Sequence, residues 1–456
     1  MTHKLFLLAM ALGYVVLLTF FGVSDYFTGN GIDDAVMYHL QYGLAGAGFL
    51  EYFDLIATAA LAFVLGVAFL SWVFFKKHRH DPSRPARAKS TLAVYLLLAA
   101  SLLLNPAVHD LCALFKSSSL PRPSAAEPFA ANADTFDEFY RKPWLAAAED
   151  TQKNLVFIYA ESLERTYFDE TVFPGLIKGL RELESQSTYF TNVGQVVGTS
   201  WTVGGMTASQ CGVPLFAPSH ENSMSGMDQF LPTAVGLGDL LRDAGYHLVY
   251  MGGAKLRFAG KGKLFRTHGF AEVLGLHELL PKIEDPENIT PWGLYDDSLL
   301  EIVYERFLEL SAGGKKFGLF TLTLDTHQPE GHMAKSCPDE HYNDGSNKML
   351  NAVACADYLI TDFINKILAS PYADRTVVVL VSDHLAMRNR AYDLLQKKAR
   401  KNLFMILEPN QKKPTEVTTA GSTLDIGPTV LPFLGFDGEI GLGRNLADAT
   451  EQTEES

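Results

Sequence analysis

Thr-Val-Val-Val-Leu-Val-Ser-Asp-His, at Thr376–His384, is a continuous apolar run that ends in two good ligands for a divalent metal. A β-branched run without polar alternation is typical of a strand buried on both faces of a parallel sheet. Asp383 and His384 follow the run directly, at the strand end where open α/β sheets bind their ligands. The stretch therefore predicts a buried strand with a metal site at its carboxyl end.

Three further predicted strands end in polar or glycine residues in the same way. They are Asn154–Tyr159, followed by Glu161 and Ser162; Phe317–Thr323, followed by Asp325 and His327; and His247–Met251, followed by Gly252 and Gly253. Helical patterns alternate with the strands, at Phe173–Ser187, Val235–Ala244, Asp296–Ser311 and Met349–Ala369. This alternation predicts an α/β fold with a doubly wound, mostly parallel sheet and an active site along one edge.

Composition narrows the class of protein. The chain has 456 residues, which favours more than one structural unit. Its net charge of −14, with no evident basic face, argues against a nucleic-acid binder. The 4 cysteines form no Cys-x-x-Cys pair, which excludes a zinc ribbon and a thioredoxin-type motif.

The N-terminal part of the chain holds three apolar stretches, at about 5–23, 55–75 and 91–111, of which the first two and the part 91–104 of the third are free of charge. A bilayer core of about 30 Å needs ~20 apolar residues, so the stretches predict three transmembrane helices. The basic residues lie in Lys76–Lys89, whereas Ser24–Asp54 has none, which places the N-terminus inside and everything after Leu111 outside. A cleaved signal peptide is the alternative for the first stretch, but an Ala-x-Ala-like site is missing and two more spans follow.

Four regions are therefore expected. They are a membrane domain at 1–111, a juxtamembrane linker rich in Ser, Pro and Ala at 112–150, an outer catalytic domain at 151–446 and a polar tail at 447–456. An outer compartment is oxidising, which makes Cys337 and Cys355 candidates for a disulfide. A buried thiol is the alternative for Cys355, which lies in a helical pattern.

Glu161, Asp383 and His384 are the predicted metal ligands. Two carboxylates and an imidazole suit Mn²⁺ or Mg²⁺ better than a thiolate-type zinc site would. A structural charge cluster is the alternative. The nucleophile is expected at a helix N-terminus on the same edge, and Gly194–Thr202 offers hydroxyls at Thr199, Ser200 and Thr202. Thr199 or Ser200 would otherwise serve as a helix cap.

Four motifs together resemble the sulfatase-like, alkaline phosphatase superfamily. They are Glu161–Glu164, Gly198–Thr202, Asp325–Pro329 and Ser382–His384. The chain is most similar to the membrane-anchored branch, with lipoteichoic acid synthases, phosphoethanolamine transferases and the phosphoglycerol transferases of osmoregulated periplasmic glucan synthesis. The resemblance to the last group extends to Ser24–Gly29, Glu161–Asp169, Ser209–Pro218 and Leu256–Lys261, and covers essentially the whole chain.

This resemblance implies one divalent metal held by Glu161, Asp383, His384 and a threonine nucleophile. In the sulfatase pattern the nucleophile lies ten positions before a glycine that ends the helix. Gly212 would be that glycine, which makes Thr202 the expected nucleophile and Thr199 the reserve. His327 would act on charge or protons at the phosphoryl group. Trp292, Asp296 and Arg257 would contact the substrate. Ser422–Asp425 lacks the additional histidine of two-metal relatives, so a single metal is expected.

The implied reaction takes phosphoglycerol from phosphatidylglycerol, holds it covalently, releases diacylglycerol and passes the group to a nascent glucan. It would occur at the bacterial inner membrane, with the catalytic domain in the periplasm. A long C-terminal region of some relatives is absent here, which leaves the engagement of the glucan open. The type of glucan and the identity of the metal are open as well.

Three other functions compete with this one. A phosphoethanolamine transferase acting on lipid A or glucan would use the same nucleophile and metal. A soluble sulfatase is disfavoured because Thr202 is not part of a Cys/Ser-x-Pro-x-Arg motif. A catalytically inactive membrane sensor is disfavoured because the nucleophile and metal ligands are all present.

Overall fold

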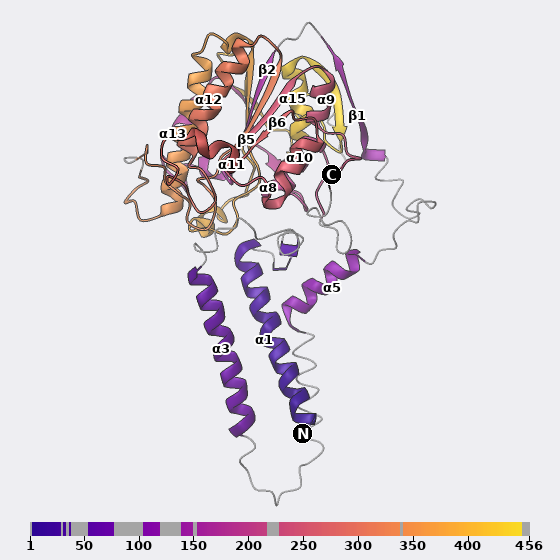
Figure 1. Cartoon of the computed structure of the whole chain (residues 1–456), viewed down its shortest axis with the longest axis vertical. Helices are drawn as coiled ribbons and strands as arrows, with labels where there is room; N and C mark the ends of the chain where they lie inside the picture. Colours follow the sequence, from indigo (N-terminus) through magenta and orange to yellow (C-terminus); the bar gives the residue numbers. More distant parts are fainter. Residues whose placement is uncertain are drawn as a thin grey trace, which may run out of the picture. The chain divides into compact units, whose positions relative to one another are not determined.

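The computed structural model describes residues 2–28, 31–32, 36–37, 53–76, 104–118, 138–148, 153–216, 228–337 and 341–448. Two compact units make up the chain (Figure 1). The first comprises Met1–Tyr38 and Gly48–Arg122, and the second comprises His39–Ala47 and Pro123–Ser456.

The N-terminal unit is helical. Its helices are α1 (Thr2–Thr28), α3 (Phe53–Lys76) and α5 (Pro106–Ser118). Within the described part of the chain, α1 is the one helix long and apolar enough to cross a membrane, over Ala9–Tyr26, and it contains the first predicted span. The apolar part of α3, Ile56–Ala68, is shorter. Most of the third predicted span, 91–103, lies outside the described residues, and its last part belongs to α5.

An eight-stranded sheet forms the centre of the second unit, in the order β10-β3-β9-β8-β2-β7-β5-β6. The pairs are parallel except those that β9 makes with β3 and β8, which confirms the predicted mostly parallel α/β sheet. Every residue of the central strands β2, β7 and β8 is buried. The strands are β2 (Asn154–Ala160), β3 (Thr188–Phe190), β5 (His247–Gly252), β6 (Glu272–Leu274), β7 (Phe317–Leu322), β8 (Thr376–Ser382), β9 (Phe404–Leu407) and β10 (Thr415–Val417).

Helices cover both faces of this sheet (Figure 1). One face carries α12 (Asp296–Ala312) and α13 (Lys348–Leu368), whose apolar sides join the main hydrophobic core. The other helices are α7 (Gly179–Glu184), α8 (Thr202–Cys211), α9 (Leu237–Asp243), α10 (Lys261–Thr267), α11 (Leu276–Leu279), α14 (Tyr392–Leu395) and α15 (Ile426–Leu434).

The helix predicted at Phe173–Ser187 is wrong in extent, because only α7 forms there. Gly175 has a φ of 66°, a left-handed conformation that interrupts a helix. Asp357 of α13 then accepts hydrogen bonds from the backbone N–H groups of Lys178, Gly179 and Leu180. A carboxylate from a distant helix therefore sets where α7 begins, which local sequence cannot reveal.

The linker predicted at 112–150 is also corrected. Arg141–Ala147 forms strand β1, which pairs antiparallel with β12 (Phe436–Gly441). The pairing partner lies at the far end of the chain, so the segment reads as irregular when its sequence is considered alone. A further small sheet joins β4 (Val193–Gly194) to β11 (Gly421–Ser422), just before the turn that leads to Thr202.

A disulfide joins Cys337 to Cys355 of α13, with the two Cα atoms 5.7 Å apart. Both cysteines are buried. The bridge therefore ties the segment that follows β7 to the helix that covers the sheet.

Candidate metal and nucleophile site

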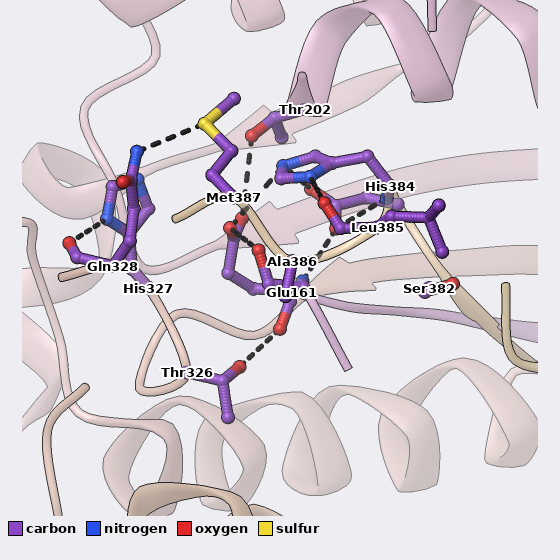
Figure 2. Close-up of polar contacts among 12 residues, drawn as sticks. Glu161, Thr202, Thr326, His327, Gln328, Ser382, His384, Leu385, Ala386 and Met387 are labelled. Carbon is purple, nitrogen blue, oxygen red and sulfur yellow. Dashed lines mark hydrogen bonds and ion pairs between the residues drawn. The ribbon is translucent and has the colours of Figure 1, made fainter. Parts of the chain in front are cut away.

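The site starts from the register of the two central strands. β2 and β8 are parallel, and Ala160 lies opposite Ser382, so Glu161 and Asp383 leave the sheet at the same level. Glu161, Asp383 and His384 each offer a ligand atom, and these atoms lie within 4.8 Å of one another (Figure 2). All three side chains are buried.

The donor set fits a divalent cation. Asp383 Oδ1 accepts hydrogen bonds from the backbone N–H groups of Ser162 and His384, both at 2.9 Å. Its other oxygen, Oδ2, is buried without a hydrogen-bond partner in the structure as described. Burial and the Glu161 carboxylate raise the pKa of Asp383 to about 7. Two buried carboxylates beside an unpartnered oxygen are the environment that a bound cation relieves.

His384 presents the correct nitrogen to this group. Its Nδ1 lies 2.8 Å from the carbonyl oxygen of Leu385, which can only accept, so Nδ1 carries the proton. Nε2 is left 3.5 Å from Glu161 Oε1 and 3.4 Å from Asp383 Oδ2. Burial opposes the charged imidazolium, but the Asp383 and Glu161 carboxylates outweigh it and raise the pKa of His384. A backbone carbonyl behind a histidine is the usual arrangement for a metal ligand.

Thr202 is the hydroxyl that reaches this group. It is the first residue of α8, and its Oγ1 lies 3.4 Å from Glu161 Oε2 (Figure 2). Thr199 instead donates its hydroxyl to the carbonyl oxygen of Val196 at 2.8 Å. Trp201 occupies the N-cap position without a side-chain cap, so neither Thr199 nor Ser200 caps the helix. The geometry therefore favours Thr202 over Thr199 as the nucleophile.

Close packing brings the start of α8 to the end of β8. A Cβ on Gly205 would lie 1.7 Å from the carbonyl oxygen of Asp383. A Cβ on Gly204 would lie 2.8 Å from the carbonyl oxygen of Gly198. Only glycine permits these two approaches, which place the positive end of the helix dipole beside the carboxylates.

A buried ion pair supports the loop after His384. Arg400 donates from Nε to both oxygens of Glu164, at 3.0 and 3.1 Å, and its NH2 group also binds Glu164 and the carbonyl oxygen of Ala386. The N–H of Ala386 donates to Glu164 at 2.9 Å. Glu164 was part of a recognised motif, whereas Arg400 gave no signal, because its partner lies far away in the chain.

His327 lies against the predicted substrate contact Trp292. Their ring centroids are 3.8 Å apart. His327 Nδ1 lies 2.9 Å from the carbonyl oxygen of Gln328 (Figure 2). That carbonyl fixes the proton on Nδ1. Trp292 is buried, and its ring, tilted by 35° against the imidazole, restricts the orientation of that side chain.

The structure corrects the predicted substrate contact of Asp296. Its carboxylate is fully buried and accepts hydrogen bonds from the N–H groups of Leu324, at 2.6 Å, and Asp325, at 3.0 Å. Asp325 in turn accepts from the N–H of Asp296 at 3.1 Å. Burial raises the pKa of Asp296 to about 7 and, together with the charge of Asp296, raises the pKa of Asp325. Asp296 therefore holds the loop that carries His327.

Two cations near the site have different surroundings. Arg257, a predicted substrate contact, is exposed in the turn before the 3-10 helix Phe258–Gly260. Lys261 is buried, with Nζ 5.0 Å from the centre of the Phe258 ring. Burial lowers the pKa of Lys261 to about 8, while Glu161 and Asp383 act in the opposite direction. Lys261 is thus a cation within electrostatic reach of the metal-binding carboxylates.

Comparison with known sequences identifies related families. Residues 153–436 match the model described as Sulfatase, and residues 2–123 match the model described as Phosphoglycerol transferase I, N-terminal domain. Phosphoglycerol transferase I of Citrobacter koseri is 41% identical over 434 residues, which are 95% of this chain and 55% of the relative. The relative of the same description from Escherichia coli O6:K15:H31 is 39% identical over 447 residues, 97% of this chain and 56% of its own. The chain spans about half the length of these relatives.

Solved structures show the same fold. An alkaline phosphatase superfamily protein from Vibrio parahaemolyticus matches with a TM-score of 0.53 and 23% identity, over 66% of this chain and 71% of its own. The lipoteichoic acid synthase LtaP from Listeria monocytogenes matches with a TM-score of 0.52 and 18% identity, over 66% and 76%. The lipooligosaccharide phosphoethanolamine transferase A of Neisseria meningitidis matches with a TM-score of 0.54 and 14% identity, over 98% and 85%. The second unit therefore has the alkaline phosphatase and sulfatase fold.

Proposed function

Because the chain belongs to the sulfatase family, we propose that it transfers phosphoglycerol from phosphatidylglycerol to membrane-bound nascent periplasmic glucans and releases diacylglycerol. The observation that carries this proposal is the hydroxyl of Thr202, 3.4 Å from Glu161 in a buried group of three metal ligands. The similarity to phosphoglycerol transferase I over 95% of the chain supports the choice of the transferred group.

Glu161, Asp383, His384 and Thr202 would hold a single divalent metal, Mn²⁺ or Mg²⁺. Such an ion neutralises charge on phosphoryl oxygens and lowers the pKa of a hydroxyl beside it. Oxygen ligands with one imidazole suit either of these ions.

In the first step, Thr202 Oγ1 bonds to phosphorus and the bond from phosphorus to the diacylglycerol oxygen breaks. The hydroxyl proton of Thr202, whose pKa the bound cation would lower, is released to solvent. His327 gives a proton to the departing diacylglycerol oxygen. Phosphoglycerol is then attached to Thr202, and diacylglycerol leaves as a neutral alcohol.

In the second step, a sugar hydroxyl of the glucan bonds to the same phosphorus, and the bond to Thr202 Oγ1 breaks. His327 takes the proton of the sugar hydroxyl, and Thr202 takes a proton back from solvent. Both histidine steps need the imidazole in one orientation, which the adjacent Trp292 ring and the Asp296 hydrogen bonds would maintain.

Lys261 would bind the phosphate of the donor. A buried ammonium close to two carboxylates loses solvation, and an anionic phosphate would supply a partner for it. Arg257 would contact the donor or the glucan from its exposed position.

The proposed location is the bacterial inner membrane, with spans at about 5–23, 55–75 and 91–111 and the catalytic domain in the periplasm. The apolar stretch of α1 and the basic segment Lys76–Lys89 support this arrangement. The catalytic domain would include Arg141–Ala147, which pairs with β12.

The test uses the purified full-length protein with Mn²⁺, phosphatidylglycerol in micelles and a short β-glucan. We expect diacylglycerol and a glucan heavier by one phosphoglycerol from the wild-type protein and from Thr199→Ala, but neither product from Thr202→Ala. Product from Thr202→Ala would overturn the assigned nucleophile. Diacylglycerol formed from phosphatidylethanolamine, and none from phosphatidylglycerol, would replace the proposal with phosphoethanolamine transfer.

A further inference from the structure

The segment around the nucleophile carries no charge. Asp, Glu, Lys and Arg are absent between Glu184 and Glu221, in a chain with 52 acidic and 38 basic residues. This segment includes the turn before Thr202, the whole of α8 and the residues that follow it. The residues of α8 from Val203 to Cys211 are buried, so the exposed side chains here come from the turns on either side of the helix.

Two large apolar side chains of this segment are exposed. Val197 is 76% exposed and Phe216 is 54% exposed. The N–H of Leu215 donates to the carbonyl oxygen of Gly198 at 3.1 Å, so the turns that carry the two side chains adjoin. Val197 directly precedes Gly198, and Phe216 directly follows Leu215. We refer to these two side chains as the apolar rim.

The apolar rim differs from the single apolar residues that are scattered over most protein surfaces. A single exposed apolar side chain is ordinary and needs no explanation. Val197 and Phe216 lie on adjoining turns, and Val197 belongs to the turn that leads directly into Thr202. An apolar surface beside a nucleophile favours contact with an apolar part of the substrate or of its surroundings.

Exposed cations lie at the same edge of the sheet. β5 is parallel to β7, and β7 is parallel to β2, so the carboxyl end of β5 lies on the edge that carries Glu161. Lys255 and Arg257 follow β5 and are exposed, and Asp and Glu are absent from residues 253–271. In a chain with a net charge of −14, this basic segment suits an anionic surface.

We propose that the apolar rim of Val197 and Phe216 enters the surface of an anionic phospholipid bilayer, with Lys255 and Arg257 against its headgroups. The inference rests on the proposed lipid donor. Withdrawing acyl chains from a bilayer costs free energy for every methylene exposed to water. A rim seated in the bilayer lets the phosphate reach Thr202 while the acyl chains stay in the membrane. Apolar side chains together with cations are the combination that binds such a surface.

The test compares two donors that differ in where their acyl chains reside. Full-length protein is reconstituted into phosphatidylcholine vesicles. The donor is either long-chain phosphatidylglycerol within the same vesicles or dihexanoyl phosphatidylglycerol dissolved as monomers in the buffer. The double variant Val197→Ser, Phe216→Ser is compared with Val235→Ser, an exposed valine before α9.

We expect the double variant to lose about tenfold or more in kcat/KM with the long-chain donor and to stay within about twofold with the monomeric donor. Val235→Ser should change neither value. Activity with the monomeric donor also shows that the double variant is folded. An equal loss with both donors would overturn the inference, because the two residues would then act on the site or the fold. An unchanged long-chain value would overturn it as well.

Failure of the proposed function gives a different result. The proposed donor would be refuted if the wild-type protein used phosphatidylethanolamine but neither the long-chain nor the dihexanoyl phosphatidylglycerol. The same long-chain and short-chain comparison with phosphatidylethanolamine then decides the role of the apolar rim by the same criteria.

Discussion

Thr202 Oγ1 lies 3.4 Å from Glu161 Oε2, although the two residues are 41 positions apart in the chain. Thr202 begins α8, and Glu161 follows β2. The contact places a hydroxyl at the positive end of α8 and beside the three metal ligands. We expect Thr202→Ala to lower kcat by about a thousandfold or more, since the proposed covalent nucleophile would have no substitute. Thr202→Ser should retain measurable turnover. Rapid-quench measurement of diacylglycerol release checks both values, and an active Thr202→Ala would contradict the expectation.

Breaking the buried pair of Glu164 and Arg400 should destabilise the protein. The Glu164 side chain is fully buried, and that of Arg400 is 14% exposed. Removing one partner of such a pair costs about 3–5 kcal/mol, because the other charge is left without compensation. We therefore expect Arg400→Met to lower the free energy of unfolding by that amount, as measured by urea denaturation.

An exposed pair supplies the control for this measurement. Arg390 and Glu330 are also in contact, but the Arg390 side chain is 63% exposed. Arg390→Met should cost less than about 1 kcal/mol, as is usual for surface pairs. If the two arginine variants lost similar free energies of unfolding, burial of the Glu164 pair would not add to its contribution to stability.

Mn²⁺ binding should strengthen with pH. The pKa of Asp383 is raised to about 7 in the metal-free protein, and a carboxyl must lose its proton before it binds a metal. The affinity for Mn²⁺ should therefore fall as pH drops below about 7, by up to about tenfold per pH unit for each proton released. Isothermal titration calorimetry in buffers of different ionisation enthalpy measures both affinity and proton release. An affinity that is constant between about pH 5 and pH 8 would contradict this expectation.

Stability without metal should change with pH in the opposite direction. The ordinary pKa of an aspartate is 3.8, so between that value and about 7 the folded protein holds a proton on Asp383 that the unfolded chain has lost. Stability therefore decreases as pH rises through this window. Asp296, whose pKa is also about 7, adds a loss of the same sign. In EDTA, Tm should be lower at about pH 8 than at about pH 5, and Mn²⁺ should raise Tm most at the higher pH.

Lys261 should contribute an alkaline limb to the activity. Its pKa is lowered to about 8, so the ammonium that would bind the donor phosphate loses its proton as pH rises through that value. We expect kcat/KM to fall above about pH 8 in the wild-type protein. Lys261→Arg should lack this fall, because a guanidinium stays charged up to a pH of about 12. An unchanged alkaline limb in Lys261→Arg would assign it to another group.

Asp296 should act through the loop of His327 and leave the metal unaffected. Both of its oxygens accept backbone N–H groups, and an amide at this position would turn a donor toward one of them. Asp296→Asn should lower kcat by about tenfold through misplacement of His327, with little change in Mn²⁺ affinity. Asp297→Asn, at a partly exposed neighbour, is the matched control. A parallel loss of metal affinity would point to a wider structural defect.

Local sequence was sufficient for several features of this protein. The continuous apolar run of β8 predicted a buried parallel strand, and the polar residues after β2 and β8 predicted a shared edge. Both features follow from the pattern of neighbouring residues in the chain. Glu161, Asp383 and His384 were singled out by their residue types, and Thr202 by its motif. The mostly parallel α/β sheet follows from the alternation of strands and helices.

Burial of isolated polar residues was decided by the tertiary structure. Lys261 lies in a local basic segment, which is usually solvated, but the fold buries it within electrostatic reach of Glu161 and Asp383. Asp296 looks like a substrate contact, but the backbone of Leu324 and Asp325 occupies its carboxylate. The sequence itself determined the strands and the ligand residues through local apolar patterns. Only the tertiary structure decided which charges meet, because their partners come from distant segments whose approach no local pattern records.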